Sequence, residues 1–127
     1  MTRIAIYGAG AIGGYLGALL ADTDAELTLI ARGPHLAAIK KNGLSLEMAG
    51  ERTTRQIAAT DDPAEAGEQD FVIVALKAHS VPGVVGAMQP LLGADTAVVT
   101  AVNGVPWWYF HDLEGPWRNR RLESVDP

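Results

Sequence analysis

Cysteine is absent from the 127 residues, which excludes disulfide-stabilised folds, thiolate zinc sites and cysteine nucleophiles. Positive charge is scarce as well: 10 Lys and Arg stand against 15 Asp and Glu, for a formal net charge of −5. Nucleic acids and anionic membranes bind proteins through clustered positive charge, so we expect neither as a partner. The three histidines lie in separate segments without metal-ligand spacing, so no metal site is expected.

The sequence also has no apolar run near the length of a membrane-spanning helix and no recognisable targeting segment at its start. We therefore expect a cytoplasmic protein. What the chain does have is 48% hydrophobic residues, enough at this length for one globular domain with its own core. We expect residues 1–127 to form that domain.

Short apolar runs typical of strands alternate with segments of helical periodicity along most of the chain. Strands are expected at residues 3–7, 27–31, 71–76 and 97–102, and helices at residues 11–21, 33–42, 63–66 and 81–92. Residues 44–48 and 52–58 predict a β-hairpin, whose second arm we expect to be the third strand of the main sheet. The alternation indicates parallel strands joined by right-handed crossovers. The expected fold class is therefore α/β, a doubly wound parallel sheet of the Rossmann type, with the strand at 97–102 buried.

The motif G-x-G-x-x-G directly follows the first expected strand and opens the first expected helix. In this setting the first glycine permits a tight turn, the second lets the backbone approach a pyrophosphate, and the third lets helix and strand pack closely. The helix N-terminus adds unpaired N–H groups and a partial positive charge. The alternative is a glycine-rich turn of purely structural use. The candidate cofactor-binding residues are Gly8, Ala9, Gly10, Ala11, Ile12 and Gly13.

Arg32 follows the second expected strand, where NAD-binding domains usually place an acidic residue for the ribose 2′-hydroxyl. A guanidinium can instead hold a 2′-phosphate through forked, charge-assisted hydrogen bonds. At about 1.5–3 kcal/mol for each such bond, we expect a roughly tenfold to hundredfold preference for NADP(H) over NAD(H). The alternative is a solvated surface arginine.

Lys77 and Asn103 follow the strands expected at 71–76 and 97–102, where an open parallel sheet binds ligands. The lysine could contact cofactor phosphate or ribose, or it could be an ordinary exposed loop residue. The asparagine amide both donates and accepts, which suits contact with a nicotinamide ribose and a substrate oxygen together. Asn103-Gly104 is equally a common turn dipeptide.

The C-terminal segment breaks the alternating pattern. Five of the eight aromatic residues fall within eleven positions, at Trp107, Trp108, Tyr109, Phe110 and Trp117. Exposed side chains of this kind form an apolar patch, so we expect concentration-dependent homo-oligomers. The three nearby arginines, Arg118, Arg120 and Arg121, are expected to belong to a solvated segment.

Several segments, in their order along the chain, resemble the N-terminal domain of the ketopantoate reductases (2-dehydropantoate 2-reductases). They are GAGAIG after the first strand, Arg32 in LIARG, GLSLEMAG, Lys77 in VALKAHSV and Asn103 in VVTAVNGVP. The resemblance implies that residues 8–13 bind the pyrophosphate of NADP(H) and that Arg32 binds its 2′-phosphate. It further implies that Lys77 binds the cofactor and that Asn103 binds both cofactor and substrate.

The family reaction, as the resemblance implies it, is the NADPH-dependent reduction of a 2-keto acid, ketopantoate to pantoate, on the way to pantothenate and coenzyme A. In the family, the proton donor is a lysine in a helical C-terminal domain, which also supplies a glutamate. We expect this chain to be the cofactor-binding part alone, able to bind NADP(H), without a catalytic residue of its own and unable to turn over substrate. The alternatives are a non-catalytic NADP-sensing domain and another NADP-linked dehydrogenase with a separate helical domain.

Overall fold

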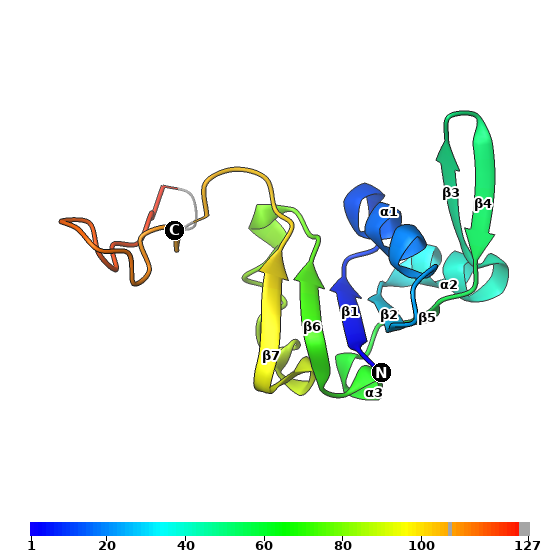
Figure 1. The fold of residues 1–127 in the computed structure, drawn as a ribbon, viewed down its shortest axis with the longest axis horizontal. Coiled ribbons are helices and arrows are strands. Elements are labelled where there is room, and N and C mark those ends of the chain that lie inside the picture. Colours follow the sequence, from blue (N-terminus) through cyan, green and yellow to red (C-terminus); the bar gives the residue numbers. More distant parts are fainter. Residues whose placement is uncertain (107, 125–127) are drawn as a thin grey trace.

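A computed structural model describes residues 1–106 and 108–124 of the chain. Its centre is a five-stranded parallel sheet in the order β5-β2-β1-β6-β7 (Figure 1). The strands are β1 (Arg3–Tyr7), β2 (Glu26–Ile30), β5 (Ala58–Thr60), β6 (Gln69–Val74) and β7 (Leu92–Thr100). The strand order reverses direction at β1 and β6, which is the topological switch point at which doubly wound sheets bind ligands. The predicted α/β fold class is confirmed.

Apolar cores form on both faces of this sheet because successive side chains of β1 point to opposite sides. Ile4 and Ile6 pack in one cluster with residues of α1 (Ala11–Leu20) and α2 (Gly33–Asn42). Ala5 and Tyr7 pack in the other, with α3 (Pro63–Ala66) and the segment that precedes β7. The expected helices at 11–21, 33–42 and 63–66 are thus present to within one residue. No helix in the described part of the chain is long and apolar enough to cross a membrane.

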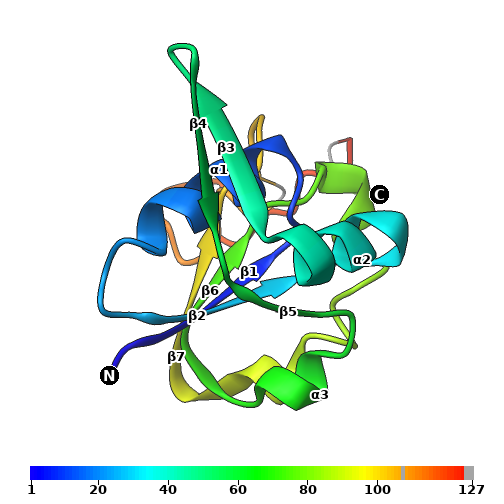
Figure 2. The same cartoon turned by 90° about the vertical axis from the view of Figure 1, so that its right-hand side faces the viewer.

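The predicted hairpin is present as β3 (Leu44–Met48) and β4 (Glu51–Arg55), joined at Ala49 and Gly50. Both of these residues have positive φ, +53° and +81°, as a two-residue turn that matches the twist of a hairpin requires. The second arm does not join the main sheet, contrary to expectation. The polar side chains of β4 are almost all exposed, and the short β5 pairs with β2 instead. The hairpin therefore stands clear of the sheet (Figure 2).

The prediction of an α-helix at residues 81–92 is wrong. The segment contains the short 3-10 helices η1 (Ala78–Ser80) and η2 (Gln89–Leu91), with turns between them. Pro90 has no N–H to donate to the carbonyl four residues before it, and Gly83 and Gly86 lie within the segment, so no continuous α-helical ladder forms. The apolar spacing still reports burial, because Leu91 lies in the second core.

The expectation that the last strand is buried is also wrong. β7 pairs with β6 on one side and is the last strand of the sheet in the described residues. Val98 is 50% exposed and Val99 is 46% exposed, because no described element covers this end of the sheet on either face. Beyond β7 the chain runs away from the sheet as a series of turns (Figure 1).

The aromatic segment packs partly on itself. Tyr109 and Phe110 meet edge to face at 5.2 Å between ring centroids, and the guanidinium of Arg120 lies 5.2 Å from the ring centroid of Trp117. Arg118 pairs with Asp112. The segment carrying Arg118, Arg120 and Arg121 is exposed, as expected. Trp107, which belongs to the predicted aromatic run, lies outside the described residues.

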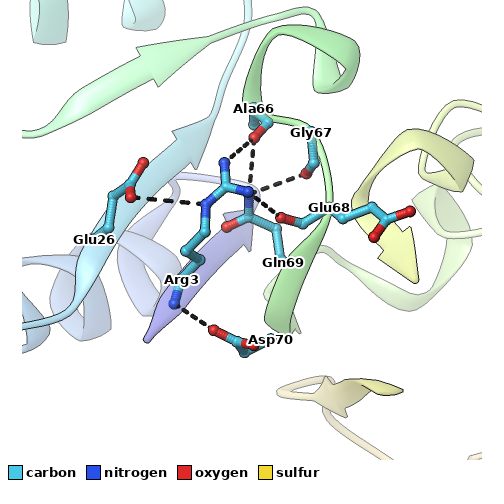
Figure 3. Close-up of polar contacts among 7 residues, drawn as sticks. All are labelled: Arg3, Glu26, Ala66, Gly67, Glu68, Gln69 and Asp70. Carbon is cyan, nitrogen blue, oxygen red and sulfur yellow. Dashed lines mark hydrogen bonds and ion pairs between the residues drawn. The ribbon is translucent and has the colours of Figure 1, made fainter. Parts of the chain in front are cut away.

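The amino-terminal ends of the central strands are held together by Arg3 (Figure 3). Its guanidinium donates to the carbonyl oxygens of Ala66 and Glu68, each at 2.6 Å, and lies 3.7 Å from the carboxylate of Glu26. Its backbone N–H donates to Asp70 at 2.7 Å. Arg3 thus ties β1 to the α3–β6 connection and to β2, at the end of the sheet opposite to the glycine motif.

Candidate functional site at the carboxyl ends of the strands

Backbone hydrogen bonds continue the parallel ladder one residue beyond each strand, across the whole sheet. They join the N–H of Ala31 to the oxygen of Thr60 at 2.9 Å, Gly8 to Ile30 at 3.0 Å, Ala75 to Tyr7 at 2.9 Å and Ala101 to Val74 at 2.9 Å. These bonds fix where four loops leave the sheet. The residues singled out in the sequence lie on these loops or, for Ala11, Ile12 and Gly13, in the first turn of α1, and therefore at one edge.

The glycine motif forms the tight loop from β1 into α1. Gly8 has φ +100°, and a Cβ there would lie 2.9 Å from the carbonyl oxygen of Ala75. A Cβ on Gly13 would lie 1.8 Å from the carbonyl oxygen of Gly8, so the third glycine allows α1 to sit directly on the loop. Both positions need glycine for physical reasons that are visible in the fold.

Gly10, the second glycine of the motif, differs from the other two. It is the N-cap of α1, has no side chain to cap the helix, and would have no atom within 4 Å of an added Cβ. The first turn of α1 contains no acidic residue that would neutralise the positive end of the helix dipole. Open space in front of exposed helix N–H groups is what a pyrophosphate requires.

A cavity of about 490 Å³ opens beside this loop. It lies between the start of α1, the start of α2 and β3, and its lining residues are Ala9, Gly10, Ala11, Gly14, Tyr15, His35, Leu44, Ser45 and Leu46. Gly14, the residue after the motif, borders it as well. Arg32, Lys77 and Asn103 do not line this cavity, although they lie at the same edge of the sheet.

Arg32 is the N-cap of α2 and its side chain is exposed. Its side chain makes no hydrogen bond and no ion pair with any residue in the described part of the chain. Its positive charge interacts with Tyr7, the last residue of β1. Burial raises the pKa of the Tyr7 hydroxyl, and the Arg32 guanidinium partly offsets this by lowering the same pKa. A cation without an anionic partner among the described residues therefore lies next to the glycine loop.

Lys77 and Asn103 lie on the other side of the loop, beyond β6 and β7. Lys77 is exposed, and its backbone carbonyl accepts a hydrogen bond from Ser80 at 2.8 Å, which starts η1. Asn103 is exposed and is followed by Gly104 with φ +91°, and the chain bends at this dipeptide. Both side chains are exposed at the edge to which the glycine loop belongs. Among the described residues, no group of three His, Asp or Glu side chains could hold a metal ion.

Sequence reasoning missed Tyr15, His35 and the hairpin as parts of this edge. The Nε2 atom of His35 lies 2.5 Å from the carbonyl oxygen of Ala9, 26 residues away in the chain. The hairpin supplies Ser45 and Leu46 to the cavity. The one available signal was that His35 comes three residues after Arg32, at the start of a helix whose N-cap already points to a ligand.

The chain is similar to known proteins in both sequence and structure. The family described as "Ketopantoate reductase PanE/ApbA" matches residues 4–106. A 2-dehydropantoate 2-reductase of Mesorhizobium japonicum is 51% identical over 126 residues, which cover 98% of this chain and 39% of that protein. A crystal structure from Ralstonia solanacearum MolK2, assigned to the ketopantoate reductases, has a TM-score of 0.93 and 50% identity over the whole chain, covering 39% of its own length.

A more distant likeness is to the ternary structure of D-mandelate dehydrogenase with NADH and anilino(oxo)acetate. It has a TM-score of 0.75 and 29% identity, and the match covers 82% of this chain and 34% of that one. The chain thus spans about two fifths or less of the length of the proteins that it matches. With a family match over residues 4–106, the chain belongs to the ketopantoate reductase PanE/ApbA family, a family of Rossmann-type NAD(P)-dependent oxidoreductases.

Proposed function

We propose that this chain is the cofactor-binding domain of an enzyme that reduces a 2-keto acid, ketopantoate to pantoate, and that its cofactor is NADP(H). The observation that carries the proposal is the glycine loop. At Gly8 and Gly13 a Cβ would clash with the backbone, and at Gly10, the N-cap of α1, an added Cβ would meet no atom within 4 Å. Such a cradle fits the pyrophosphate of a dinucleotide. The bound cofactor would supply the hydride, and the residues of the chain would bind and orient it.

The assignment of NADP(H) rather than NAD(H) depends on Arg32. This side chain has no anionic partner among the described residues, so it need not give up an ion pair to bind a phosphate. Its position directly after β2 is where the adenosine ribose is bound in dinucleotide-binding folds. Two charge-assisted hydrogen bonds to a 2′-phosphate would contribute about 3 kcal/mol or more before desolvation is subtracted. A net tenfold to hundredfold preference, roughly, remains the expectation.

Lys77 and Asn103 would serve the nicotinamide half. Both follow strands on the far side of β1 from Arg32, so a dinucleotide lying across the loop reaches one group on each side. Asn103 is proposed to hydrogen-bond the nicotinamide ribose and a substrate oxygen, since an amide has both a donor and an acceptor. Lys77 is proposed to contact cofactor phosphate or ribose. Two exposed side chains on turns can adapt to a ligand with little rearrangement of the sheet.

The proton that reduction of a ketone requires is proposed to come from a part of the relatives that this chain does not match. The chain spans 39% of the Mesorhizobium relative. We therefore assign no catalytic residue within residues 1–127. We expect the chain to bind NADPH and to leave ketopantoate unreduced. Oxidation of NADPH by the 127-residue chain in the presence of ketopantoate would contradict this division of labour.

The decisive experiment measures the affinity of NADPH and of NADH by calorimetric titration of the chain and of Arg32→Ala. We expect the substitution to weaken NADPH binding roughly tenfold to hundredfold and to change NADH binding little. Arg52→Ala is the matched control, because Arg52 is an exposed arginine on the hairpin. Equal losses for both cofactors, or no loss for either, would refute the role of Arg32. If the unaltered chain binds neither dinucleotide, the proposed function itself is wrong.

A further inference from the structure

His35 connects α2 to the glycine loop. It is the third residue of α2, and its Nε2 atom lies 2.5 Å from the carbonyl oxygen of Ala9. A carbonyl oxygen only accepts hydrogen bonds, so Nε2 must carry the hydrogen and donate it. The bond therefore joins the loop that would receive a pyrophosphate to the helix whose N-cap is Arg32.

The position of Ala9 makes this bond consequential. Ala9 lies between Gly8, whose N–H donates to the carbonyl oxygen of Ile30 at 3.0 Å, and Gly10, where an added Cβ would meet no atom within 4 Å. Glycine on both sides gives the loop several backbone conformations when no contact holds it. The His35 bond holds the carbonyl of Ala9 in one orientation, and with it the peptide unit that leads into Gly10 and α1.

The same bond fixes a distance that matters for a ligand with two anionic groups. Arg32 and His35 belong to the same helical turn, so anchoring His35 to Ala9 also fixes the start of α2 relative to the loop. Donation by Nε2 further draws off negative charge from a carbonyl oxygen beside the phosphate cradle. Both effects favour a ligand that must reach the loop and Arg32 at once.

We propose that His35 is a positioning residue that holds the glycine loop and Arg32 at the spacing of one dinucleotide. The expected effect on dinucleotide binding rests on the proposed function, whereas the positioning itself rests on the observed hydrogen bond between His35 and Ala9. The ring also lines the cavity beside the loop, so the cavity depends on the same contact for its shape. His35 itself is not proposed to touch the 2′-phosphate.

The test uses two substitutions that separate the hydrogen bond from the shape of the side chain. His35→Leu removes the donor, and His35→Gln keeps an N–H donor near the position of Nε2. We expect His35→Leu to weaken NADPH binding roughly threefold to tenfold, the range for loss of one hydrogen bond, and His35→Gln to restore most of it. Because the loop serves every dinucleotide, NADH binding should fall as well, but by a smaller factor, since only NADPH also uses Arg32. His111→Leu, the same change at an exposed tail histidine, is the matched control.

A second measurement needs no ligand. Hydrogen exchange of the amides of residues 8–14 should be faster in His35→Leu than in the unaltered chain, and near normal in His35→Gln, while exchange in β6 stays the same. Unchanged exchange in His35→Leu, or equal behaviour of the two variants, would overturn the positioning role. A loss confined to NADPH would overturn it too, because displacement of the glycine loop must weaken the binding of both dinucleotides. Absence of dinucleotide binding by the unaltered chain would refute the proposed function and leave the exchange result to decide the contact.

Discussion

Replacing Gly13 with alanine tests whether α1 can pack directly on the glycine loop only because residue 13 has no side chain. A Cβ at Gly13 would lie 1.8 Å from the carbonyl oxygen of Gly8, whereas ordinary van der Waals contact begins at 3.4 Å. The obstacle is backbone, and Gly8 is itself confined by Leu76 and Ala75, so no rotation of a side chain relieves the clash. Either α1 moves away from β1 or the loop opens. We expect Gly13→Ala to lower the free energy of unfolding by about 3 kcal/mol, the upper part of the range for overpacked sites.

Gly14→Ala is the matched substitution one residue further along the same helix. Its Cβ would lie 3.5 Å from the carbonyl oxygen of Ala9 and 3.6 Å from Leu44, both ordinary contacts. Alanine is favoured over glycine inside a helix by up to about 1 kcal/mol. We therefore expect the free energy of unfolding of this variant to stay the same or to rise by up to about 1 kcal/mol.

The assay is urea unfolding followed by circular dichroism, with the slope compared between variants so that midpoints can be converted to free energies. Titration with NADPH is the second readout, and Gly13→Ala should bind it more weakly than any variant that leaves the loop in place. Equal unfolding free energies for the two alanine variants would refute the reasoning, because the same chemical change would then cost the same at an obstructed and an open position.

Three further predictions concern other parts of the molecule. Arg55 holds the pKa of Asp22 below its usual value, so the stability that this pair adds should be present above the ordinary aspartate pKa and be lost as the pH falls through the lowered one. In thermal melts of Asp22→Asn at a series of pH values, the melting temperature should fall less steeply toward acid pH than in the unaltered chain, and an equal fall would contradict this. Arg3→Ala should lower the free energy of unfolding by about 1–2 kcal/mol through two lost hydrogen bonds, with NADPH affinity unchanged, because Arg3 lies at the opposite end of the sheet; weaker NADPH binding would count against that separation. Exposure of Val98 and Val99 on the last strand should add to the expected self-association, which changing both to threonine should reduce; monomers at high concentration in sedimentation velocity would rule it out.

The parts of the fold that the sequence predicted well are those set by neighbouring residues. The strand, glycine turn and helix of residues 3–20 follow from local sterics, which is why Gly8 and Gly13 could be assigned before any contact was known. The cap of α3 is local too: the carboxylate of Asp62 accepts the N–H of Ala64 at 2.9 Å, as Asp followed by Pro63 predicts.

The errors arise where the deciding contact is distant or where a periodic pattern conceals a missing donor. Residues 81–92 carry the right apolar spacing, but Pro90 removes a hydrogen bond that a helix needs and two glycines weaken the segment further. Val98 and Val99 are as apolar as buried residues, and their own sequence does not indicate whether another element packs against them. His35 contacts Ala9 across 26 residues, so no local pattern around either residue announces the bond.

The two ends of the sheet place stability and binding on different residues. At the amino ends, the guanidinium of Arg3 donates two hydrogen bonds of 2.6 Å to backbone carbonyl oxygens of the fold itself. At the carboxyl ends, the exposed cation Arg32 bonds to no anion in the described residues, and Gly10 faces open space. Changes at Arg32 should therefore alter binding at little cost in stability, and changes at Arg3 the reverse. Gly13 is the position where both should fall together, since the same missing side chain seats α1 on the core and shapes the loop.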